Sequence, residues 1–214
     1  MSSIAPIDAM GQERYGLKTF GYTPGKFAMW LFLASDAMGF VGLIGAYIIL
    51  RASYVGSTWV PTVGDWTEHG GGGLPHLDTT VTGINTFILI VSSFTMVRAL
   101  SAIGKGNQAG LKLWLGATIL GGATFLGVQV YEYSHLMAHG LHMQSHLYGA
   151  TFYICTAFHG AHVLSGVIYL SCIWIAAARG RYTAESHSPV ELVGLFWHFV
   201  DLVWIILFTI VYLI

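Results

Sequence analysis

Apolar residues are gathered into five long runs that are separated by more polar segments. Each run approaches or exceeds roughly 20 residues, the length that a helix needs to cross the hydrocarbon core of a bilayer. The pattern therefore predicts an all-α fold, an integral membrane bundle of five transmembrane helices in a single domain over residues 27–214. The helices are expected at about 27–51, 80–100, 111–133, 147–178 and 190–213, after a polar N-terminal arm over residues 1–26.

Composition supports this class. The chain is 55% hydrophobic and only 9% charged, whereas soluble domains carry about 25% charged residues. A net charge of −1 gives no reason to expect a nucleic-acid partner.

The basic residues predict an orientation. With five spans, a single side of the membrane receives all Lys and Arg residues except Arg51, namely Arg14, Lys18, Lys26, Arg98, Lys105, Lys112, Arg179 and Arg181. Basic residues favour the cytoplasmic side, so the N-terminus is expected in the cytoplasm and the C-terminus in the periplasm. The long loop over 52–79 is then external. Its run Gly70–Gly73 is not followed by the Lys-Ser/Thr of a phosphate-binding loop, and it indicates a flexible connector.

Polar residues occur at mid-depth in three of the predicted helices. Asp36, His159, His162, His198 and Asp201 fall at one level when residues are counted at 1.5 Å each from the helix ends. A carboxylate at the centre of a bilayer costs about 2.5–3.5 kcal/mol on insertion scales. No Lys or Arg lies at that depth, so we expect the carboxyl groups to pair with His, hydroxyl or indole groups, or to stay protonated.

More specific expectations follow for these residues. Asp36 is expected to bond to His162, and Asp201 to a nearby hydroxyl or indole. Trp197, Asp201 and Trp204 share one helix face at 100° per residue, with His198 about 60° away. Glu132 and Asn85 are further polar residues, and each lies near the outer end of its predicted helix. The first predicted helix also carries a stripe of small residues that allows close helix packing, Ser35, Gly39, Gly42 and Ala46.

Several functions could use such residues. His159, His162 and His198 could ligate haem axially, as in a di-haem membrane cytochrome, although such proteins usually need two His pairs. A proton relay through Asp36, His162 and Asp201 is a second alternative, but these residues lie at one level and not along a path across the bilayer. Inter-helix hydrogen bonding is a third. A transporter is disfavoured because internal repeats and broken helices are not evident.

A second group of histidines lies at the predicted outer surface. Four of them follow a helical spacing, His135, His139, His142 and His146. Imidazoles in such a stripe could hold zinc or copper, although no cysteine accompanies them. A contact with a partner or a solvated amphipathic turn is the alternative, and no metal site is assigned.

Motifs in all five of the predicted helices resemble subunit III of haem–copper terminal oxidases. The resemblance covers about Trp30 to the C-terminus, with the motifs in the family's order. It is carried by Trp30–Met38, the pair Asn85-Thr86, Tyr131-Glu132-Tyr133, the run Phe158-His159-Gly160-Ala161-His162-Val163, and the closing Trp197-His198-Phe199-Val200-Asp201-Leu202-Val203-Trp204.

The resemblance implies a haem-free accessory subunit with no metal and no catalytic residue of its own. Its implied partners are subunit I, which holds both haems and the copper of the oxygen site, and subunit II. It also implies that the subunit binds phospholipid, with no contact residues assigned. The implied role is to support the stability of subunit I and its proton uptake, and the implied location is the inner membrane of a bacterium. A respiratory supercomplex is a further association that the resemblance allows.

Two departures from the family pattern bear on these expectations. Many members have seven helices, whereas only a polar arm precedes the first helix here, as in a short bacterial form. Asp36 stands at a position where members of the family most often have Glu. Aspartate at this position resembles the quinol-oxidase branch of the family. Cytochrome c oxidase is the expected complex, with quinol oxidase or a nitric oxide reductase accessory subunit as the alternatives.

Overall fold

The computed structural model describes residues 24–54, 59, 79–138, 140–144 and 147–213. Among these residues all regular secondary structure is helical, and five helices are long and apolar enough to span a membrane. The predicted all-α bundle of five spans is therefore confirmed. Residues 1–23 of the polar arm and most of the loop over 52–79, including its glycine run, lie outside the described residues.

Apart from the helix at Leu147–Ala178, which matches its predicted run, the helices extend slightly beyond the predicted apolar runs. Their bounds are Pro24–Ser53 for α1, Thr79–Gly104 for α3, Gln108–Ala138 for α4, Leu147–Ala178 for α5 and Ser188–Phe208 for α6, which continues into a π-helical turn, η2, at Thr209–Leu213. Polar residues at the ends add a turn or less to most helices, because backbone hydrogen bonding can continue past the hydrocarbon core.

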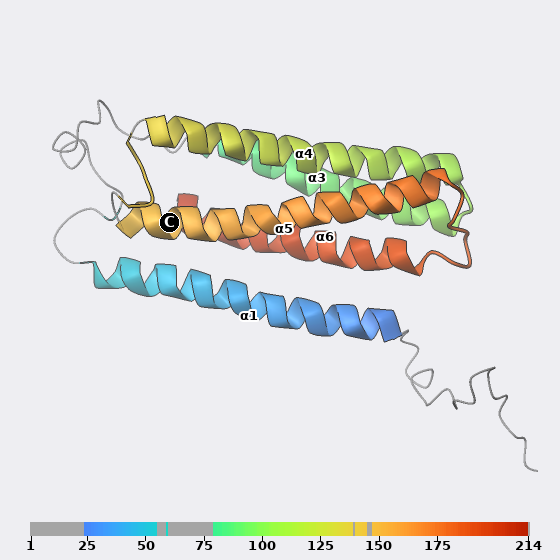
Figure 1. Cartoon of the computed structure of the whole chain (residues 1–214), viewed down its shortest axis with the longest axis horizontal. Coiled ribbons are helices and arrows are strands. Elements are labelled where there is room, and N and C mark those ends of the chain that lie inside the picture. The colour runs from blue at the N-terminus through green and yellow to red at the C-terminus, as the bar shows by residue number, and fades with distance from the viewer. Residues whose placement is uncertain (1–23, 55–58, 60–78, 139, 145–146, 214) are drawn as a thin grey trace, which may run out of the picture.

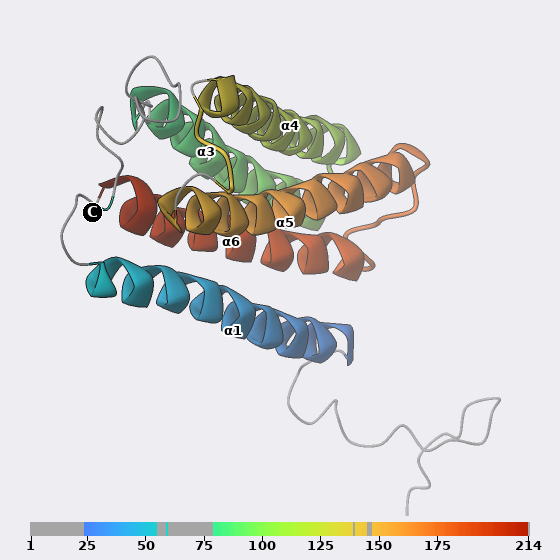
Figure 2. The same ribbon diagram turned by 60° about the vertical axis from the view of Figure 1, so that its left-hand side comes forward.

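The helices form a group of four and a single flanking helix. α3, α4, α5 and α6 contact one another around a common core, whereas α1 contacts α6 and α5 (Figure 1). The view turned by 60° shows the same separation, with α1 on the side of α6 and α5 that faces away from α3 and α4 (Figure 2).

Short connections place the helices next to one another. Between α3 and α4, Gly106 adopts φ 73°, a left-handed conformation that glycine tolerates without steric cost. Asn107 then caps α4, because its Oδ1 accepts a hydrogen bond from the Gly110 N–H at 2.9 Å. Gly180, at φ 71°, ends α5 in the same left-handed conformation.

The centre of the four-helix group is a close fit of an indole against two glycines. Trp197 on α6 is 1% exposed. A Cβ added at Gly122 on α4 would lie 2.5 Å from its ring, and one at Gly166 on α5 would lie 2.9 Å away. The missing side chains at these glycines therefore make the space that the indole fills.

The small-residue stripe on α1 is exposed in this chain. Ser35, Gly39, Gly42 and Ala46 all lie on the open side of the helix. A Cβ added at Gly42 would meet nothing within 4 Å among the described residues. The close packing that the stripe allows is thus not made within the described part of the chain.

Candidate functional site: polar contacts between the helices

The expected bond between Asp36 and His162 is present. Nε2 of His162 on α5 lies 3.1 Å from Oδ1 and 3.0 Å from Oδ2 of Asp36 on α1. The two side chains are 15–16% exposed. The imidazole packs against the rings of Phe40 and Phe158, at 5.0 and 4.7 Å between centroids. This pair joins α1 to α5.

His159 has a different environment, although it lies one turn away on the same helix. It is fully buried, and neither ring nitrogen has a hydrogen-bond partner within the described residues. Its ring stacks on Trp204 at 4.8 Å, and Phe125 meets it edge-on at 5.8 Å. The enclosed imidazole thus packs as an aromatic side chain.

His198 and Asp201 share a hydroxyl group on α3. Nδ1 of His198 lies 2.6 Å from Oγ of Ser93, and the same hydroxyl lies close to the Asp201 carboxyl group. Asp201 is 8% exposed, and its Oδ1 has no partner among the described residues. The hydroxyl expected near Asp201 is therefore Ser93, a residue that the sequence did not single out.

The two indoles of the closing motif also bond to hydroxyls of α3. Nε1 of Trp197 donates to Oγ of Ser92 at 3.1 Å, and Nε1 of Trp204 donates to Oγ1 of Thr86 at 2.9 Å. Trp197, Asp201 and Trp204 are all buried, as the shared helix face predicts. The motif thus presents its polar groups to α3 along one side of α6.

Glu132 and Asn85 make inter-helix contacts near the other end of the bundle. One oxygen of Glu132, Oε1, accepts from Oγ1 of Thr82 at 3.0 Å and from the Tyr212 hydroxyl at 3.2 Å. Nδ2 of Asn85 donates to the carbonyl oxygen of Phe125 at 3.2 Å. The carboxyl group thus links α3, α4 and η2, and the amide links α3 to α4.

A network between α4 and α5 was not anticipated from the sequence. Nε2 of Gln129 donates to the Tyr133 hydroxyl at 3.1 Å and to the carbonyl oxygen of Thr156 at 3.0 Å. The Tyr133 hydroxyl also lies 2.6 Å from Oγ1 of Thr156. Hydroxyl and amide residues are common in membrane helices, so neither spacing nor charge distinguished these three.

The predicted mid-depth residues therefore form separate contacts. No hydrogen bond or ion pair among the described residues joins the Asp36–His162 pair to His198 or Asp201. The ring of Phe40 packs beside the pair, with its centroid 5.0 Å from that of His162 and 6.3 Å from that of Phe199. Residues that were predicted at the same depth in the bilayer do not form one cluster, because their side chains project to different sides of the bundle.

Of the outer histidine stripe, His135 and His142 are described, whereas His139 and His146 lie outside the described residues. His135 stacks against Tyr131 at 6.3 Å. Among the residues that the structure describes, no group of three or more His, Cys, Asp and Glu side chains could hold a metal ion. The stripe as a whole is thus untested.

α1 is held at both ends by contacts other than the Asp36–His162 pair. At its start, Nζ of Lys26 lies 2.6 Å from Oε2 of Glu191 in the first turn of α6. Near its end, Nε1 of Trp59 donates to the Tyr47 hydroxyl at 3.2 Å. The Trp59 ring also meets those of Tyr54 and Tyr148, at 5.4 and 6.2 Å between centroids.

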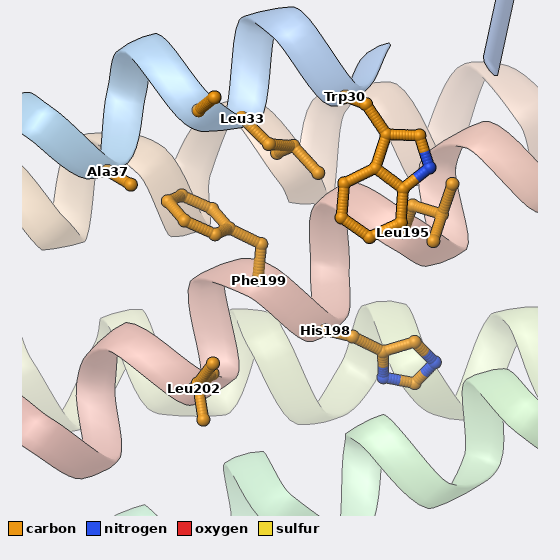
Figure 3. Close-up of a pocket in the computed structure, with 8 residues that line it drawn as sticks. Trp30, Leu33, Ala37, Leu195, His198, Phe199 and Leu202 are labelled. Atoms are coloured by element: carbon orange, nitrogen blue, oxygen red, sulfur yellow. The ribbon is translucent and has the colours of Figure 1, made fainter. Parts of the chain in front are cut away.

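An apolar groove runs between α1 and α6. It consists of two adjoining hollows of about 400 and 310 Å³ that share Trp30, Leu195 and His198. Lys26 and Glu191 border one end. Figure 3 shows the hollow at the other end, where Leu202 lies. At 1.5 Å per residue, Glu191 to Leu202 spans about 16 Å, close to half of the roughly 30 Å hydrocarbon core.

Comparison with known proteins identifies the family. The model of the family "Cytochrome c oxidase subunit III" matches residues 10–214. The chain belongs to the cytochrome c oxidase subunit III family. Its resemblance to subunit III of haem–copper oxidases is thereby confirmed, and the chain is an accessory subunit of such an oxidase.

Named relatives agree with this assignment. The cytochrome c oxidase subunit 3 of Synechocystis sp. is 39% identical over 90% of this chain and 82% of its own length. That of Corynebacterium diphtheriae is 38% identical, over 86% and 85% of the two chains. That of Bacillus subtilis is 34% identical, over 94% and 96%.

Proposed function

We propose that this chain is the haem-free subunit III of a bacterial cytochrome c oxidase, with no catalytic centre of its own. In this proposal it associates with subunits I and II, which carry the haems and the copper. The supporting observation is that the polar residues of its motifs bond or pack against other residues of the same chain, as Asp36 does with His162 and Trp204 with Thr86. These side chains are engaged in holding helices together.

The proposed role is to keep subunit I stable and supplied with protons during turnover. The test is the oxidase carrying Asp36→Leu, which loses the bond between α1 and α5. Its haem content is expected to match that of the wild type, while its activity decays sooner during continuous oxygen reduction. Loss of haem from the purified variant would contradict a role confined to support.

Cytochrome c is the proposed electron donor, since the named relatives are cytochrome c oxidase subunits. Quinol is the alternative, favoured by aspartate in place of glutamate at Asp36, and a nitric oxide reductase accessory subunit is the third candidate. The subunit II that copurifies with this chain separates the first two. A cysteine pair for dinuclear copper in it supports cytochrome c, and a subunit II without that pair supports quinol.

The proposed location is the cytoplasmic membrane of a bacterium, with the N-terminus inside. Lys26, Lys105 and Arg181 lie at one end of the bundle and Arg51 at the other, which fits the excess of basic residues on the cytoplasmic side. In a cysteine-free background, Glu185→Cys should react with an impermeant maleimide only after the cells are opened. Ser53→Cys should react in intact cells, and the reverse pattern would contradict this orientation.

We also propose that the groove between α1 and α6 holds an acyl chain of a phospholipid from the cytoplasmic leaflet. Its apolar lining and its length of about half the hydrocarbon core support this occupant. Leu195→Trp would fill the groove, whereas Leu113→Trp alters the exposed face of α4. Mass spectrometry should show fewer retained phospholipids in the first variant only, and equal retention in both would contradict the assignment.

A further inference from the structure

The contacts of His162 determine where its hydrogens lie. Nδ1 is 2.7 Å from the carbonyl oxygen of Phe158. A carbonyl oxygen can only accept a hydrogen bond, so Nδ1 must carry a hydrogen. Nε2 faces the two oxygens of Asp36 at 3.1 and 3.0 Å, and these contacts also require a hydrogen. A single proton is therefore placed either on Nε2 or on the carboxyl group.

The surroundings of the pair disfavour separated charges. The imidazole lies between the rings of Phe40 and Phe158. No Lys or Arg occurs between Lys26 and Arg51, or anywhere in α5 and α6. His159, the other titratable side chain of α5 at this level, is fully buried and lies on its far side against Trp204. An imidazolium and a carboxylate would both be poorly solvated here.

The hydrogen bonding of Asp36 supports the same conclusion. An ionised carboxylate can accept about four hydrogen bonds, and burial penalises one that accepts few. Among the described residues, the only polar group in contact with the Asp36 carboxyl group is Nε2 of His162, which lies 3.1 Å from Oδ1 and 3.0 Å from the buried Oδ2. A protonated carboxyl group fits this environment better, because its O–H needs only one acceptor.

We propose that Asp36 and His162 form a neutral site that holds one proton within the bilayer. The proton resides on the carboxyl group of Asp36, which donates it to Nε2 of a neutral His162. Nδ1 of His162 donates in turn to the carbonyl oxygen of Phe158. This assignment goes beyond the supporting role proposed above and does not depend on it.

Infrared spectroscopy of the intact oxidase tests the protonation state directly. The variant is Asp36→Asn, and the spectrum of interest is the difference between wild type and variant, recorded in H₂O and in D₂O. The expected result is a carbonyl band of a protonated carboxyl group that moves to lower frequency in D₂O. Carboxylate bands in the wild-type side of the difference would overturn the proposal.

Substitution provides a second, independent test. The amide of Asp36→Asn can donate to Nε2 of a neutral His162, so it should replace the protonated carboxyl group. The retention of this subunit by the solubilised complex should stay within about twofold of the wild type for Asp36→Asn, and fall roughly tenfold for Asp36→Leu. An equally large loss in both variants would show that the negative charge is required and would overturn the proposal.

The infrared comparison needs only the wild type and Asp36→Asn, so it decides the proposal even if Asp36→Leu does not accumulate. It also separates this proposal from the supporting role. A protonated carboxyl band together with an unchanged lifetime of Asp36→Leu during turnover would confirm the neutral pair and contradict the role that we propose for it in the oxidase.

Discussion

The four-helix group and the flanking helix α1 are held in place by different means. α6 buries ten of its residues, among them Trp197 and Trp204, whereas α1 buries only Leu33, Phe40 and Tyr47. α1 compensates with three contacts spread along its length: the ion pair of Lys26, the Asp36–His162 bond and the packing of Trp59 near Tyr47.

This difference shows how an apolar environment changes the free energy that each kind of contact contributes to helix association. Lipid tails are as apolar as leucine, so burying apolar surface between helices gains little inside a bilayer. Close packing and hydrogen bonding must then determine which helices associate. The four-helix group has both, whereas α1 relies mainly on a few polar and aromatic contacts, and it should separate from the bundle more readily.

The largest expected effect is in the four-helix group. Gly122→Ala places a Cβ 2.5 Å from the Trp197 ring, and overpacking of this kind costs about 1–3 kcal/mol. The free energy of unfolding in detergent and denaturant should fall accordingly. Gly127→Ala on the same helix is the control, because its Cβ would meet nothing within 4 Å among the described residues. Equal effects of the two would contradict the close fit.

The next prediction asks whether polar bonds also matter within the four-helix group. Glu132→Leu removes an acceptor of the Thr82 and Tyr212 hydroxyls, and leaving the buried Tyr212 hydroxyl without this acceptor costs about 1–3 kcal/mol. Unfolding should therefore require less denaturant. Glu132→Gln keeps an oxygen acceptor and should lie closer to the wild type. If Glu132→Leu were as stable as the wild type, polar contacts would not contribute to the stability of the four-helix group, and the prediction would be wrong.

Trp59→Ala should loosen α1 without unfolding the four-helix group. An aromatic pair contributes about 0.5–1.5 kcal/mol, and Trp59 makes three such contacts and one hydrogen bond. Amide hydrogen exchange should rise near Tyr47, and exchange in α3 and α4 should not change. Trp174→Ala, on α5 and 39% exposed, is a matched control: it also loses an indole and one hydrogen bond, to the carbonyl oxygen of Lys112 on α4, so its effect should lie near that contact and not near Tyr47. Faster exchange throughout would contradict a local effect.

The smallest effect is expected for Lys26→Met. The side chains of Lys26 and Glu191 are 32% and 28% exposed, and ion pairs of this exposure contribute about 0–1 kcal/mol. Any loss in stability should shrink further at high salt, because exposed charges are screened. A loss larger than that of Trp59→Ala would show that the ion pair is the principal contact of α1.

The sequence predicted the helices because each apolar run is long and few charges interrupt it. It also predicted the bond between Asp36 and His162, since two costly groups at equal depth have few other partners. It missed the roles of Ser93 and Gln129, because hydroxyl and amide residues in membrane helices carry no distinctive pattern. The space left by Gly122 and Gly166 for Trp197 depends on how three helices meet, which no single segment encodes.

Equal depth was a poor guide to which residues meet. It grouped His159, His198 and Asp201 with the Asp36–His162 pair, although these side chains project to different sides of the bundle. Rotation of each helix about its axis is set by packing, and the apolar pattern is too uniform around these helices to fix it.

The central claim is that Asp36 and His162 hold α1 against α5 by acting on each other. A double-mutant cycle of Asp36→Leu and His162→Leu, read as the free energy of unfolding, tests it most directly. Coupling between contacting residues is about 0.5–3 kcal/mol, so the double variant should be more stable than the sum of the two single effects predicts. Additive effects of the two substitutions would contradict the claim.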